Sequence, residues 1–194
     1  MIRDIVLCST SRYRGELLER LRLPFTCARP ETDETPRSGE PAAALSERLA
    51  EAKSRALASR FPDALLIGSD QVASVAGRIL GKPGTREAAV EQLLAASGQE
   101  VEFHTAVAVL DAVQDRCLMH RDVTTVGFRT LTRSAIESYL DQEPALDCAG
   151  SFKCEGLGIT LFDQIDTRDP TALIGLPLIA TARLLRQFGV DPLG

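Results

Sequence analysis

The stretch that decides the fold is Ala64-Leu65-Leu66-Ile67-Gly68-Ser69-Asp70-Gln71. Its first five residues form a continuous apolar run, which is typical of a buried central strand. The run stops at Ser69, so we expect the strand to end there and the Asp70 carboxylate to project from its end. Ligands of α/β sheets commonly bind at such strand ends, which makes Asp70 a candidate site residue. The alternative is an aspartate that caps a turn.

Other segments on both sides of this run indicate further strands and helices. Apolar or alternating patterns predict strands at residues 4–8, 25–28, 72–75, 101–110, 123–128 and 159–165. Helical periodicity is found after Ser11 and at residues 41–60, 85–96, 132–141 and 177–188. This alternation predicts an α/β fold in which helices flank a mixed, twisted sheet. The length of 194 residues, 44% of them hydrophobic, fits a single domain over residues 1–194.

Charge and cysteine content exclude several classes of partner. The 22 basic and 27 acidic residues are scattered along the chain, so no basic stripe predicts nucleic-acid binding. Five cysteines without a CxxC pair argue against a zinc site and favour a reducing compartment. No apolar run has the length of a signal peptide or a membrane span. We therefore expect a cytoplasmic protein with no membrane partner.

The segment Ser9-Thr10-Ser11-Arg12-Tyr13-Arg14 lies between a predicted strand and a predicted helix. Hydroxyls, helix N–H groups and two guanidinium groups there can converge on phosphate oxygens. An ordinary Ser/Thr helix cap with surface arginines explains the same residues equally well.

Two lysines are candidate phosphate ligands. Lys82 follows Gly81, but Gly77 is one residue too close and Pro83 replaces the Ser or Thr of a P-loop, so we reject that motif. Lys82 is thus either a phosphate ligand on a tight loop or a solvated turn lysine. Lys53 lies about 40° from Leu49 on the apolar face of its helix. From the sequence alone, an ammonium that snorkels to the surface is favoured over one that reaches into a cleft.

Glu34 lies in a polar segment rich in acidic residues, and with Asp70 it forms a candidate carboxylate pair. Two such groups can hold a divalent cation through oxygen ligands or orient an attacking water.

Taken together, these segments resemble those of the Maf-like nucleotide pyrophosphatases, and the match runs nearly from end to end. The matching segments are Leu7-Cys8-Ser9-Thr10-Ser11 through Arg14, Asp33-Glu34, Lys53, Gly68-Ser69-Asp70-Gln71, Gly81-Lys82-Pro83, Ser97-Gly98, Ala149-Gly150-Ser151-Phe152 with Glu155-Gly156, and Gly175-Leu176-Pro177-Leu178.

The resemblance implies a Maf/ITPase-like fold with a cleft between two α/β lobes. It implies that a nucleoside triphosphate and a divalent metal cation, such as magnesium or manganese, bind in this cleft. The residues that would line the triphosphate and metal site are Ser9, Arg14, Glu34, Lys53, Asp70 and Lys82. Asp70 would act as general base or hold the metal-bound water, and Asp70 and Glu34 would be the metal ligands. A homodimer is a further expectation of the family.

Within the family, branches that act on dTTP and UTP carry Arg, Thr and Gln where this chain has Tyr13, Gln71 and Glu155. The present residues resemble the 7-methyl-GTP branch, which carries an aromatic residue, Gln and Glu there. The methylated base is positively charged, so an aromatic face and a carboxylate would favour it. Two departures are Arg12, where the family usually has proline, and Tyr13 in place of the branch's Trp. Arg12 either contacts phosphate or points to solvent.

Competing hypotheses are a pyrophosphatase for dTTP, UTP or damaged purine triphosphates, and a nucleotide-binding regulator of cell division with little turnover. The residues Tyr13, Gln71 and Glu155 argue against dTTP and UTP. The presence of Asp70, Glu34 and both lysines favours an enzyme over a regulator.

Overall fold

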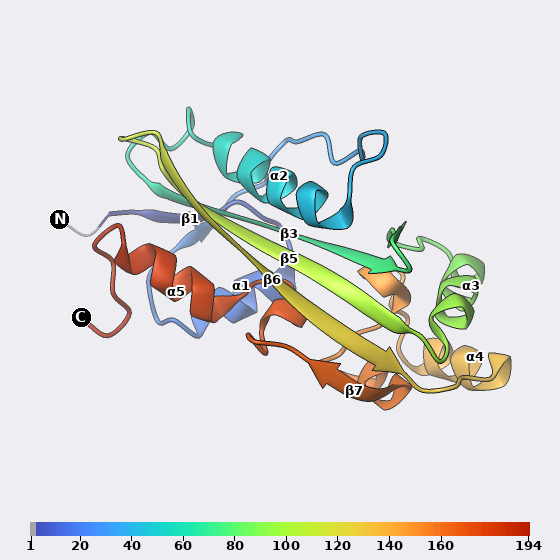
Figure 1. Ribbon diagram of the computed structural model, residues 1–194. Helices are drawn as coiled ribbons and strands as arrows, with labels where there is room; N and C mark the ends of the chain where they lie inside the picture. Colours follow the sequence, from blue (N-terminus) through green and yellow to red (C-terminus); the bar gives the residue numbers. More distant parts are fainter. Residues whose placement is uncertain (1–2) are drawn as a thin grey trace.

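The computed structural model describes residues 3–194, which form one seven-stranded mixed sheet flanked by helices (Figure 1). The strands are β1 (Ile5–Leu7), β2 (Thr26–Cys27), β3 (Leu65–Val75), β4 (Arg78–Leu80), β5 (Glu100–Asp111), β6 (Arg116–Phe128) and β7 (Phe162–Asp166). The helices are α1 (Arg12–Glu19), α2 (Ala42–Arg55), α3 (Arg86–Ala96), α4 (Arg133–Gln142) and α5 (Leu178–Arg186). Three short 3-10 helices, η1 (Ala149–Ser151), η2 (Leu157–Leu161) and η3 (Ala172–Ile174), complete these elements.

The sheet changes from parallel to antiparallel at β3. Strand β1 pairs in parallel with β2 on one side and with β3 on the other. Strands β5, β6 and β7 then add to β3 in antiparallel order, and β4 pairs with the far end of β3. Helix α2 covers one face of the long strands, and α1 and α5 lie on the other (Figure 1). The predicted mixed sheet with flanking helices is therefore confirmed.

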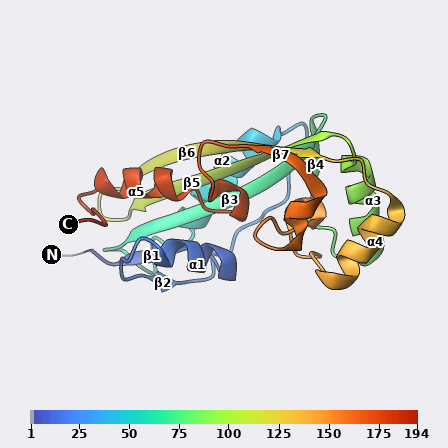
Figure 2. The same ribbon diagram turned by 90° about the horizontal axis from the view of Figure 1, so that it is seen from below.

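Two hydrophobic clusters occupy opposite ends of the long strands. One cluster contains side chains of α1 and α5 and includes Leu65 and Ile67 of β3. The other contains side chains of α3 and α4 and includes Ala73 and Val75 of the same strand. Figure 2 shows α1 with β1 and β2 at one end and α3 with α4 at the other. Asp70 thus lies midway between two separate apolar cores, which corresponds to the expected two lobes.

The prediction that the central strand ends at Ser69 is wrong. Strand β3 continues without interruption to Val75, because β5 pairs with it residue by residue from Leu65 to Val75. What ends near Ser69 is the parallel neighbour, since Leu7, the last residue of β1, lies opposite Ile67. The separate strand predicted at 72–75 is the second half of β3. Asp70 therefore projects from mid-strand, just beyond the end of β1.

Several predicted boundaries also change. Helix α2 ends at Arg55 and is followed by turns, so the predicted helix to residue 60 is too long. Strand β6 begins at Arg116, seven positions before the predicted start at Val123. The first part of the predicted strand 159–165 belongs to the 3-10 helix η2, and the strand itself, β7, begins at Phe162 and pairs with β6.

The helix starts predicted at Thr85 and Thr132 are confirmed. The Thr85 hydroxyl accepts a hydrogen bond from Ala88 N at 3.2 Å, and the Thr132 hydroxyl accepts one from Ala135 N at 3.2 Å. No helix within residues 3–194 has the length and apolar character needed to cross a membrane. The single domain over residues 1–194 stays a prediction, and its first two residues lie outside the described range.

Candidate active site

A cleft of about 1460 Å³ opens beside the middle of β3. Its walls come from the β1–α1 turn, the polar segment 29–36, the Gly81–Lys82 loop and the segment 147–155. All nine residues predicted from the sequence line this cleft: Ser9, Tyr13, Arg14, Glu34, Lys53, Asp70, Gln71, Lys82 and Glu155. Segments that are far apart in the chain therefore meet in one cavity, as the resemblance implied.

Gly68 explains how α2 comes close enough to β3 to supply a side chain to the cleft. A Cβ atom at this position would lie 2.1 Å from Ala50 O and 2.8 Å from Ser54 N, both in the backbone of α2. Only glycine leaves room for the helix backbone to rest directly on the strand. Lys53 lies on this helix face, so the close approach directs its side chain toward Asp70.

Lys53 joins the two candidate carboxylates. Its Nζ lies 2.6 Å from Asp70 Oδ1 and 2.7 Å from Glu34 Oε1. The Lys53 side chain is only 7% exposed, so the favoured prediction of a snorkelling ammonium is wrong. Because a buried ammonium is costly without partners, these two ion pairs account for a lysine inside an apolar face.

Neighbouring charges shift the pKa values of both Glu34 and Arg14. Burial alone would raise the pKa of Glu34, but the hydrogen bond from Lys53 and the charges of Lys53, Lys82 and Arg14 bring that pKa below its usual value. Burial lowers the pKa of the Arg14 guanidinium, and the charges of Asp70 and Glu34 oppose this effect. Arg14 Nε donates to Gly175 O at 2.9 Å, which fixes the guanidinium at the cleft wall.

The start of α1 carries N–H groups with no side-chain cap. The capping position is Ser11, whose side chain makes no hydrogen bond to the helix, and the first turn contains no acidic residue. Ser9 Oγ instead accepts a hydrogen bond from Ser11 N at 3.1 Å. This arrangement favours the anion-binding interpretation over a self-capped helix. Arg12 pairs with Glu16 at 2.6 Å and is 86% exposed, which favours the solvent-facing alternative for that residue.

Tyr13, Gln71 and Glu155 also line the cleft. Gln71 Nε2 donates to Thr105 Oγ1 at 3.1 Å and to the carbonyl oxygens of Ala172 and Leu173 at 3.0 and 2.9 Å. These acceptors fix the orientation of the amide and leave its carbonyl oxygen, Oε1, for a ligand.

Sequence comparison identifies the family to which this arrangement belongs. The family model described as "Maf-like protein" matches residues 4–188. The chain belongs to the Maf-like family. A 7-methyl-GTP pyrophosphatase of Xanthomonas oryzae pv. oryzae is 59% identical over 189 residues, which are 97% of this Maf-like chain and 98% of the relative. One of Bordetella pertussis is 54% identical over 190 residues, covering 97% and 94% of the two chains.

Two solved structures also resemble this Maf-like chain. A HAM1 protein from Coxiella burnetii has a TM-score of 0.48 at 19% identity and covers 66% of this chain and 73% of its own. The Staphylococcus aureus Ham1 protein has a TM-score of 0.47 at 16% identity, with 65% and 72% coverage.

The carboxylates of Asp70 and Glu34 fit a divalent cation that is also bound by the phosphates of a substrate. No group of three or more His, Cys, Asp or Glu residues within residues 3–194 is arranged to hold a metal ion. Lys53 contacts one oxygen of Asp70 and one of Glu34, so the second oxygen of each carboxylate remains for another ligand. Mg²⁺ is commonly bound by one or two carboxylates together with substrate phosphates and waters, which this donor set fits.

Lys153 is a site neighbour that the sequence interpretation missed. Its Nζ lies 5.9 Å from the centroid of the Tyr13 ring, within the range of a cation–π contact. The interaction with the neighbouring Tyr13 hydroxyl outweighs burial and raises the pKa of Lys153. The feature of the sequence that could have indicated Lys153 is its position as an isolated basic residue in the glycine-containing segment 148–156, two residues before Glu155.

Proposed function

We propose that this chain hydrolyses 7-methyl-GTP to 7-methyl-GMP and pyrophosphate. The observation that carries the proposal is Lys53 bridging Asp70 and Glu34 in a cleft that also contains Tyr13 and Glu155. The relatives named 7-methyl-GTP pyrophosphatase, at 54–60% identity over nearly the whole chain, support the same substrate.

The residues at the phosphate end supply charge and a proton acceptor. Asp70 orients the attacking water and accepts its proton as the water oxygen bonds to the α-phosphorus. The bond from that phosphorus to the bridging oxygen breaks, and pyrophosphate leaves with this oxygen. Arg14, Lys53 and Lys82 balance the negative charge that collects on the leaving group.

A divalent cation fits this reaction as part of the proposal. Held by Asp70 and Glu34 together with phosphate oxygens, magnesium or manganese would supply Lewis-acid polarisation of the phosphates. Ser9 and the uncapped N–H groups of α1 bind phosphate oxygens beside it.

The residues at the base end select a cationic guanine. Methylation at N7 gives the base a positive charge, which favours the Tyr13 face and the Glu155 carboxylate. The free Gln71 Oε1 accepts hydrogen bonds, and guanine offers N–H donors where adenine has an acceptor.

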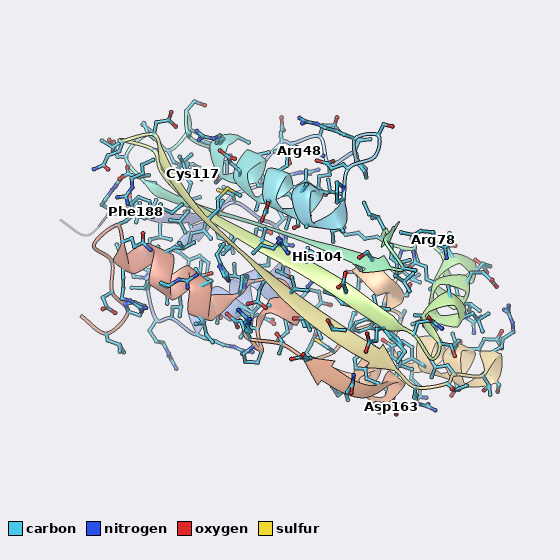
Figure 3. The ribbon with its side chains drawn as sticks, viewed as in Figure 1. Arg48, Arg78, His104, Cys117, Asp163 and Phe188 are labelled. Atoms are coloured by element: carbon cyan, nitrogen blue, oxygen red, sulfur yellow. The ribbon has the colours of Figure 1, made fainter. Side chains whose placement is uncertain are left out.

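The proposal is tested by pyrophosphate release with magnesium or manganese from 7-methyl-GTP, GTP, dTTP, UTP and ITP. We expect 7-methyl-GTP to be cleaved preferentially, and Asp70→Asn to lower turnover by about 10²- to 10⁴-fold, the range for a general base. Asp163→Asn is the matched control, because Asp163 is an exposed residue of β7 outside the cleft (Figure 3).

The alternatives predict different results in this assay. Preference for dTTP or UTP would overturn the base selection and leave the hydrolytic mechanism in place. Nucleotide binding without pyrophosphate release under either metal would favour a binding regulator.

A further inference from the structure

Two cleft loops meet on a single side chain of α3. Gln92 Oε1 accepts a hydrogen bond from Ser151 Oγ at 2.6 Å, and Gln92 Nε2 donates to Gly81 O at 3.0 Å. Gln92 itself is outside the residues that line the cleft. One amide group thus joins the loop that carries Lys82 to the segment that carries Glu155.

Ser151 needs an external partner to hold its conformation. It is fully buried and has a φ of 65°, a left-handed conformation that a residue with a Cβ rarely adopts. Gly150 before it has a φ of 79°, so the chain makes two successive left-handed steps. These steps direct Phe152 into the cleft wall, where its ring packs against Phe103 at a centroid distance of 5.3 Å. The path from Ser151 to Glu155 therefore starts from a strained residue that Gln92 holds.

The hydrogen bond between Gln92 and Gly81 affects the position of the neighbouring Lys82. Gly81 and Lys82 are both exposed, and α3 begins at Arg86, a few residues later. The hydrogen bond from Gln92 to Gly81 O fixes the backbone immediately before Lys82. A second link, from Gly84 N to Leu146 O at 3.0 Å, joins the same two segments on the far side of Lys82.

We propose that Gln92 is a positioning residue that sets the separation between Lys82 at the phosphate end and Glu155 at the base end. This inference rests on the proposed function. A primary amide is required because one end of the side chain must accept from a hydroxyl while the other donates to a carbonyl. Glutamate lacks the donor, and methionine lacks both strong hydrogen-bonding groups at similar length.

The test compares Gln92→Met with Gln142→Met. Gln142 is an exposed residue of α4, and within residues 3–194 its Nε2 donates only to the backbone and side chain of Ser138 in the same helix. For Gln92→Met we expect the KM for 7-methyl-GTP to rise about two- to tenfold, the scale of one neutral hydrogen bond, with a smaller change in kcat. The preference for 7-methyl-GTP over GTP in kcat/KM should fall as well. Gln142→Met should change neither quantity.

A double-mutant cycle with Ser151→Ala separates positioning from simple stabilisation. If Gln92 acts through Ser151, the combined variant should raise KM by less than the product of the two single effects. Fully multiplicative effects, or a lower unfolding midpoint with unchanged KM and base preference, would overturn the inference.

Amide hydrogen exchange measured without nucleotide tests the Gln92 bridge independently of the proposed function. Gln92→Met should accelerate amide exchange in both residues 81–84 and residues 148–155, whereas Gln142→Met should leave both segments unchanged. Acceleration in both segments with no cleavage of 7-methyl-GTP by the wild type would support the bridge and reject the proposed function. Unchanged exchange in either segment would reject the bridge, whichever nucleotide is cleaved.

Discussion

Nζ of Lys53 lies 2.6 Å from Oδ1 of Asp70, although the two residues are 17 positions apart and their side chains are only 7% and 10% exposed. A buried ion pair gains little net stability, because desolvation of both charges offsets their attraction. Removal of one partner is different, since it leaves the other charge buried and unpaired.

Lys53→Met should therefore destabilise the protein by about 3 kcal/mol at pH 7, as expected when one partner of a buried pair is lost. Urea unfolding measures this change in the free energy of unfolding. The double variant Lys53→Met/Asp70→Asn should recover part of the loss, because it removes the unpaired charge. A loss below about 1 kcal/mol in the single variant would show that water screens the pair.

Tyr13→Leu should reduce the preference for 7-methyl-GTP over GTP by about 2- to 30-fold in kcat/KM, which corresponds to the energy of a cation–π contact. Tyr13→Phe is the matched control, since it keeps the aromatic face and loses only the hydroxyl. Steady-state kinetics with both nucleotides gives the ratio. Equal preference in the Leu and Phe variants would exclude the ring as the element that selects the charged base.

Glu40 should make stability depend on pH in the acid range. Arg48 donates to both Glu40 carboxylate oxygens at 2.6 and 2.8 Å, and these hydrogen bonds lower the pKa of Glu40 from 4.5 to about 2. Arg48 also donates to Thr35 O, next to Glu34, from its place on α2 (Figure 3). Because the folded-state pKa is depressed, this stabilisation is present above pH 4.5 and is lost as the pH falls toward about 2.

Urea unfolding at pH 7 and pH 3 checks this linkage. Glu40→Gln should lose less stability than the wild type between the two pH values. Glu19→Gln, at the exposed end of α1, should follow the wild type. An identical pH dependence in wild type and Glu40→Gln would contradict the assignment.

Gly68→Ala should impair both folding and catalysis. Its Cβ would lie 2.1 Å from Ala50 O, and that backbone atom can move only if α2 moves. We expect a loss of about 1–3 kcal/mol from overpacking and a reduced kcat, because Lys53 moves with the helix. Gly15→Ala is the control, since its Cβ would meet only Cys27 Sγ at 4.0 Å. If Gly68→Ala had the same stability and turnover as the wild type, α2 would be able to move away from β3 without cost.

The fold and the set of cleft residues were accessible from the sequence for a physical reason. Apolar periodicity reports which face of an element is buried, so α3 and β5 were predicted nearly to the residue, and α2 and β6 were predicted with one end misplaced. The family resemblance then predicted that distant residues such as Ser9 and Glu155 lie in one cleft.

Other features depend on tertiary contacts that no local pattern contains. Strand β3 continues through Ser69 and Asp70 because β5 pairs with it, although polar residues locally favour a strand end. The position of Lys53 required knowledge that Glu34, from a distant loop, would reach it. The Gln92 contacts join α3 to two loops, one of them 59 positions away, and nothing in the helix periodicity predicts them.

The uninterrupted ladder between β3 and β5 limits how this enzyme can close on a substrate. A hinge at Asp70 would have to break main-chain hydrogen bonds on both sides of that residue and bend two long strands together. The central strands therefore stay rigid. Conformational adjustment to a nucleotide must come from the loops that line the cleft, residues 29–36, 81–84 and 147–155. Substrate-dependent differences in mobility should be concentrated in those three segments, while the central strands keep the same amide protection with and without nucleotide.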